Sequence, residues 1–80
     1  MPVVLRVGGF AFKMYPEDHA PPHVHVRYGR HTCKGELATL LLSRSNLTTS
    51  EEARAVRMVA AHGEILFAAW AQVVGKGEMT

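Results

Sequence analysis

The sequence predicts an α+β domain in which a small antiparallel β-sheet, built from two hairpins, is covered on one face by a C-terminal helix. Two observations favour this class. Apolar and polar residues alternate in the first half of the chain, whereas after residue 50 apolar residues recur at helical spacing. A one-sided sheet and a helix with a wide apolar stripe each need a covering layer, so we expect them to cover one another.

The first hairpin is predicted over residues 3–15. A short β-branched apolar run, Val3 to Val7, is followed by Gly8-Gly9, two positions that tolerate the positive φ of a tight hairpin turn. The next strand places large apolar side chains on one face: Phe10, Phe12 and Met14. Prolines at both ends of residues 16–22 then predict a loop.

The second hairpin is predicted over residues 23–41, with Gly29-Arg30 as its two-residue turn. The expected pairs are Tyr28 with His31, Val26 with Cys33, Val24 with Gly35, His25 with Lys34 and His23 with Glu36. A slip of one residue would move Lys34 and Glu36 to the apolar face, where burying their charges is costly. The other face, with His23, His25 and Arg27, is expected to stay uncovered.

The helix is predicted from about Thr49 to Val74, either as one helix or as two segments bent at Gly63. Thr48 and Glu51 have the spacing of a capping box. Apolar residues then follow at helical spacing as far as Val74, and Trp70 is expected in the core because it continues this stripe.

Length and composition limit the possible functions. A chain of 80 residues is expected to form a single domain, residues 1–80, too small for the large enzyme classes. With 48% hydrophobic and 20% charged residues it does not match a disordered chain, and no apolar run is long enough to cross a membrane. The net charge is only +2, and the single cysteine, Cys33, is expected in the core rather than as a nucleophile.

The segment Asp18 to Val26 carries the strongest chemical signal, because three histidines fall within seven residues. His23 and His25 leave the same strand face, and Arg27 follows on that face. One imidazole can accept a proton, the other can donate one, and the guanidinium can hold a phosphate, which together suit metal-independent cleavage of RNA. Glu36 would fix the tautomer of His23, and His19 would support the pair.

Two other interpretations of the same residues stay open. His23 and His25 could share a metal ion with a further ligand from His19, Asp18 or Glu36. Alternatively, the histidines could be structural, in a protein-binding module without catalysis. We take the catalytic interpretation, with no metal and no cofactor, as the prediction. Its site residues are His23, His25, Arg27, Glu36 and His19.

Four stretches of the sequence resemble domain-of-unknown-function family 4160. They are Val4-Leu5-Arg6, Gly9-Phe10, Asp18 to Val26 and Leu66 to Trp70, and Pro21 to Val26 is the most specific of them. The polar stretch Ser43 to Thr49 and the glycine Gly63 depart from the family pattern. Neither departure touches the histidines.

The resemblance implies a small bacterial protein of the cytoplasm that is the toxin of a toxin–antitoxin pair. Its expected partner is an antitoxin that resembles domain-of-unknown-function family 2442. RNA is the expected target, and no membrane association is expected. The non-catalytic alternative is a protein-binding or metal-binding module.

Overall fold

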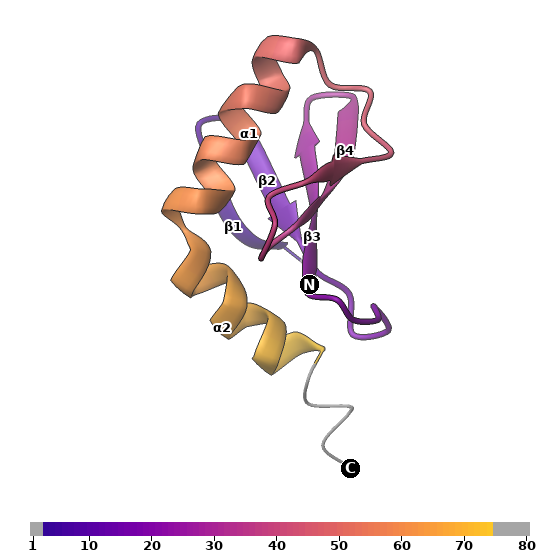
Figure 1. Ribbon diagram of the computed structural model, residues 1–80, viewed down its shortest axis with the longest axis vertical. Coiled ribbons are helices and arrows are strands. Elements are labelled where there is room, and N and C mark those ends of the chain that lie inside the picture. The colour runs from indigo at the N-terminus through magenta and orange to yellow at the C-terminus, as the bar shows by residue number, and fades with distance from the viewer. Residues whose placement is uncertain (1–2, 75–80) are drawn as a thin grey trace.

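The computed structural model describes residues 3–74 and has the expected order of strands followed by helices. The strands are β1 (Val3–Val7), β2 (Phe10–Lys13), β3 (His23–Tyr28), β4 (His31–Glu36) and β5 (Leu42–Ser43). The helices are α1 (Thr49–Ala61) and α2 (Gly63–Val73). Neighbouring strands pair in an antiparallel manner in the order β1-β2-β3-β4-β5, so the α+β class is confirmed (Figure 1).

Both hairpins form with the predicted turns. Gly8 and Gly9 have φ angles of +54° and +86°, and Gly29 has +62°, a region that favours glycine. A Cβ atom at Gly9 would also lie only 3.0 Å from the ring of Tyr28, which would have to move to accommodate a side chain. All five pairs expected across β3 and β4 are present, including His23 opposite Glu36.

The second hairpin is shorter than predicted and is followed by an unexpected strand. β4 ends at Glu36, and the chain turns back so that β5 pairs with Lys34 and Gly35. The amide of Leu37 donates to the carbonyl of Pro22, and Leu40 adopts a φ of +63°. The apolar run after Glu36 thus folds into a turn and an edge strand instead of lengthening β4.

The helical region forms two helices, so the prediction of a single helix from Thr49 to Val74 is wrong and the bent alternative is correct. α1 begins with the predicted capping box, in which Thr48 and Glu51 bond to one another's backbone amides. The break falls at His62, which has a φ of −111° and a ψ of 26°. Its ring nitrogen Nδ1 donates to the carbonyl of Met58, and α2 starts at Gly63.

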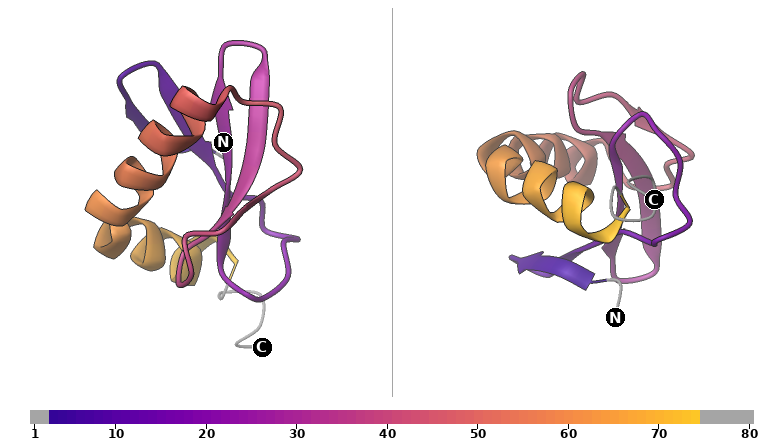
Figure 2. Two further views of the ribbon diagram at one scale, coloured as in Figure 1. Left: turned by 45° about the horizontal axis from the view of Figure 1, so that its top comes forward. Right: turned by 90° about the horizontal axis from the view of Figure 1, so that it is seen from below.

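Both helices lie on the same side of the curled sheet (Figure 2). The buried core combines strand residues from one sheet face, helix residues from the facing side of α1 and α2, and residues of the connecting segments. Its members are Phe10, Phe12, Met14, Val24, Val26, Cys33, Leu37, Leu47, Ala55, Val59, Leu66, Trp70 and Val74. In the part of the chain that the structure describes, neither helix covers the opposite face of β2, β3 and β4 beyond the contact of Trp70 with His23 at the start of β3, so its other polar side chains are available for function.

Trp70→Ala tests this packing. The Trp70 side chain is in the core, and large-to-small aromatic changes there cost about 3–5 kcal/mol. We expect a loss of this size in the free energy of unfolding measured with denaturant. Phe67→Ala is the matched control on the same helix, because Phe67 is 43% exposed and should change the stability little. Equal midpoints for wild type and Trp70→Ala would contradict the described packing.

Candidate functional site

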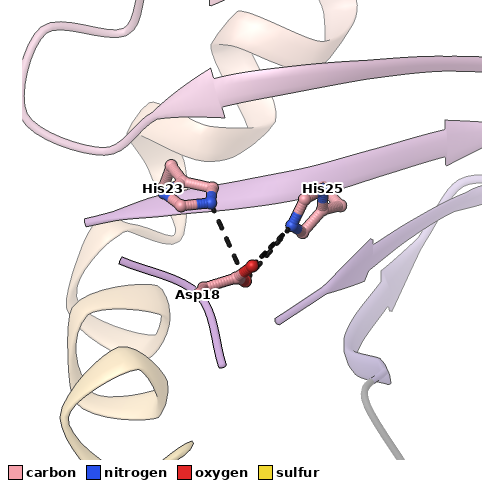
Figure 3. Close-up of side chains that lie close together, drawn as sticks. All are labelled: Asp18, His23 and His25. Atoms are coloured by element: carbon pink, nitrogen blue, oxygen red, sulfur yellow. Dashed lines mark hydrogen bonds and ion pairs between the residues drawn. The ribbon is translucent and has the colours of Figure 1, made fainter. Parts of the chain in front are cut away.

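The loop between β2 and β3 places Asp18 beside the two histidines of β3 (Figure 3). The amide of Asp18 donates to the carbonyl of Tyr15 over 3.0 Å, and the amide of Tyr15 donates to Asp18 Oδ2, also over 3.0 Å. This reciprocal pair of bonds closes a tight turn at the start of the loop. The turn holds the Asp18 carboxylate in one position, where only 13% of the side chain is exposed.

His25 is the accessible histidine of the group. Its Nε2 lies 3.2 Å from each oxygen of Asp18, so the ring donates to the carboxylate from that nitrogen. The side chain is 35% exposed, and the ring of Tyr15 lies edge-on with its centroid 5.0 Å away. His25 therefore has a fixed orientation while part of its ring still faces solvent.

His23 is buried, although the alternation of β3 predicted it on the uncovered face. Only 6% of its side chain is exposed, because the ring of Trp70 packs against it at 5.1 Å between centroids. Its Nδ1 donates to the carbonyl of Pro21 over 2.9 Å, since a carbonyl oxygen can only accept. Nε2 then points toward Asp18 Oδ2 at 3.7 Å, a distance too long for a hydrogen bond.

The environment of Asp18 keeps its carboxyl group ionised. Burial raises its pKa, but the hydrogen bonds from the Tyr15 amide and His25 and the nearby imidazoles outweigh burial, so the pKa lies below its usual value. The site thus contains a carboxylate with two imidazoles whose centroids are 5.2 Å apart.

The other predicted site residues do not join this cluster. Glu36 pairs with His23 in register, but its carboxylate accepts from Thr39 Oγ1 over 3.2 Å, and the tautomer of His23 is set by Pro21 instead. His19 is exposed in the loop. Arg27 is exposed on the same sheet face as His25, where its Nε donates to the carbonyl of Gly29.

The sequence pattern indicated Asp18 only as one of several alternative metal ligands. It did not predict that Asp18 lies between His23 and His25 and hydrogen-bonds to His25. The available signal was the sequence Tyr15-Pro16-Glu17-Asp18. Proline at the second position of a four-residue turn favours a chain reversal, and an aspartate can bond to nearby backbone amides. That reversal directs Asp18 back toward the sheet.

A basic hollow of about 510 Å³ surrounds His25 on the uncovered face of the sheet. Five cationic side chains line it, and no Asp or Glu is among its lining residues. The cations are Lys13, Arg27, Arg30, Lys34 and Arg44. Within residues 3–74, none of them forms an ion pair with a carboxylate. A second hollow shares Lys13 and Arg27 and adds Arg6, so the positive charge extends toward β1.

Cys33 also borders the basic hollow but has no nucleophilic character. Its side chain belongs to the core, and burial, with a smaller contribution from Glu52, raises the pKa of the thiol to about 11. At neutral pH the group is a thiol rather than the reactive thiolate. The expectation that Cys33 is a core residue is confirmed.

Residues 9–71 match the family described as Domain of unknown function (DUF4160), and the chain belongs to this family. The matched region includes the loop, both histidines of β3 and Trp70. Comparison with curated proteins and with solved structures gave no match. Within residues 3–74, neither helix combines the length and apolar character that crossing a membrane requires.

Asp18→Asn tests the role of the carboxylate in holding the site. Replacing a charged acceptor by a neutral one should lower the free energy of unfolding at neutral pH by about 1–2 kcal/mol. Because folding lowers the Asp18 pKa, the ionised group stabilises the fold above its ordinary pKa of 3.8, and this contribution is lost as the pH falls through the folded value.

The difference between wild type and Asp18→Asn, measured by denaturant unfolding, should therefore shrink in acid. Glu17→Gln, at the neighbouring exposed position, should leave the stability unchanged. An Asp18→Asn variant as stable as the wild type at neutral pH would show that the carboxylate does not hold the loop.

Proposed function

We propose that this protein is the toxin of a bacterial toxin–antitoxin pair and that it acts on RNA bound to the uncovered face of the sheet. The observation that carries the proposal is the set of five cations around His25, which, among residues 3–74, have no carboxylate partner and no acidic neighbour in the lining of the hollow. Such a surface attracts a polyanion, because each phosphate contact releases condensed counterions. The toxin role and the bacterial cytoplasm are supported by the family resemblance.

The hollow has features that suit single-stranded RNA. Lys and Arg side chains from β2, β3 and β4, from the turn between β3 and β4, and from the position after β5 can follow successive phosphates across the strands. Tyr15 lines the same hollow, and an aromatic ring beside basic groups provides a surface on which a base can stack. A volume of about 510 Å³ is within the range of sites for nucleotide-sized ligands.

His25 is the group that we propose at the reactive centre of this face. It is the histidine that lines the hollow, and Asp18 fixes its orientation. A second imidazole acting as acid, as the sequence predicted for His23, has less support, because the His23 ring is buried and its Nδ1 is bonded to Pro21. Proton transfer to a substrate needs direct reach or one bridging water.

The proposed partner is an antitoxin that resembles domain-of-unknown-function family 2442. A chain of 80 residues buries a limited part of its apolar surface, and a partner can cover the remainder. Large apolar side chains that remain exposed support this proposal: Leu41, Ile65 and Phe67, at 66%, 51% and 43%.

RNA binding can be measured directly with a fluorescent single-stranded oligonucleotide over a range of salt concentrations. Arg27→Gln should weaken binding and reduce the slope of log K against log salt by about 0.7, the contribution of a single contact to a single strand. Arg57→Gln is the matched control, because it removes the same charge from an exposed position on α1, away from the sheet face. Equal effects of the two variants, or no RNA binding by the wild type, would refute the proposed RNA site.

The same proposal is tested in cells by following growth and total RNA after expression. The wild type should arrest growth and degrade RNA, and co-expression of the antitoxin should restore growth. His25→Ala should lose about 10²–10⁴-fold in activity if His25 takes part in the reaction. Unchanged growth with intact RNA on wild-type expression would contradict the toxin role.

A further inference from the structure

We propose that Asp18, His23 and His25 together bind one divalent transition-metal ion, of which Zn²⁺ fits the donor set best. The proposal that the cluster binds a metal depends only on the positions of these three side chains. The further proposal that the ion influences RNA binding rests on the proposed function, in which RNA occupies the basic hollow beside the ion. The proposal departs from the metal-independent chemistry that the sequence predicted.

The three side chains have nearly the spacing of metal ligands. One donor atom from each residue lies within 4.8 Å of the other two. Asp18 Oδ2 is 3.2 Å from Nε2 of His25 and 3.7 Å from Nε2 of His23. In a tetrahedral zinc site with bonds of about 2.0–2.1 Å, neighbouring ligand atoms are about 3.3–3.4 Å apart. The two separations from Asp18 are close to this value, and the donors of His23 and His25 lie within 4.8 Å of one another, so side-chain movements would bring the three donors around one ion.

The hydrogen bonding of His23 is the second observation that points to a cation. Because Nδ1 donates to Pro21, a neutral His23 ring directs the lone pair of Nε2 toward the Asp18 carboxylate. Nε2 and Asp18 Oδ2 lie 3.7 Å apart with no hydrogen bond between them. Both atoms can therefore bind one cation placed between them. A ring that donates its other N–H to a backbone carbonyl is the usual arrangement of a metal-binding histidine.

The remaining ligands are held in a similar way. The Tyr15 amide donates to Asp18 Oδ2 and fixes the carboxylate. His25 donates from Nε2 to Asp18, and metal binding would shift its proton to Nδ1 or release it, so that the Nε2 lone pair faces the ion. The loop and β3 thus supply a site whose ligands need little reorganisation.

Three protein ligands leave a tetrahedral ion with an open position, as in catalytic rather than structural zinc sites. His25 is the ligand that lines the basic hollow, so the ion would lie at the edge of the surface where RNA would bind. The nearby Lys34 and Arg27 disfavour a cation on its own, and a phosphate would offset their charge. Zinc and RNA should therefore bind more tightly together than separately.

The single tryptophan, Trp70, provides a probe for the ion because its ring packs against His23. Zn²⁺ titrated into the purified chain without RNA should change the Trp70 fluorescence, saturate at one equivalent and raise the melting temperature. Asp18→Asn and His25→Gln should each weaken binding at least about 100-fold, since even losing a residue that orients a ligand costs about 10–100-fold.

His62→Gln is the matched control, because it removes a histidine at the junction of α1 and α2, outside the cluster. Wild-type-like affinity in this variant, with loss in the two ligand variants, supports the proposal. No effect of Zn²⁺ on the wild type, or equal affinity in all variants, overturns it.

RNA binding measured with Zn²⁺ and with EDTA separates the two proposals. Tighter RNA binding with Zn²⁺ supports both. If Zn²⁺ binds at this cluster but RNA does not bind, the metal site holds and the proposed function fails. If RNA binds equally in both conditions and Zn²⁺ does not bind, the metal proposal alone fails.

Discussion

The carboxylate of Asp18 is the group on which the arrangement of the site depends. It accepts from the Tyr15 amide, which closes the loop, and from Nε2 of His25, which orients the accessible imidazole. It also faces Nε2 of the buried His23. One ionised group thus connects the end of β2, the loop and the start of β3. Asp18 is ionised at neutral pH, and the lowered pKa extends this connection further into acid.

His23 and His25 differ in exposure, although strand alternation places them on one face, so they are suited to different roles. His25 contacts the basic hollow, whereas His23 is enclosed between Trp70 and the loop. An acid–base pair would need both rings to reach the substrate. A metal ion would need only a lone pair from each, and burial of one ligand is compatible with that role. The burial of His23 is therefore an argument for the proposed metal site rather than for a mechanism that uses two imidazoles as acid and base.

Much of the fold could be predicted from interactions between residues that are close in the sequence. The glycine turns, the capping box at Thr48 and the register of β3 and β4 were predicted because each depends on near neighbours or on keeping charges out of the core. The edge strand β5 and the enclosure of His23 were not predicted. Each depends on contacts between distant segments, such as Trp70 against His23, that no local pattern encodes.

Anomalous diffraction at the zinc absorption edge, from crystals grown with Zn²⁺, tests the central claim most directly. The account predicts one strong peak about 2.0–2.2 Å from a carboxylate oxygen of Asp18 and from Nε2 of both His23 and His25. A peak at His31 or His62 with none at this cluster, or a direct hydrogen bond between His23 and Asp18 with no peak, would contradict it.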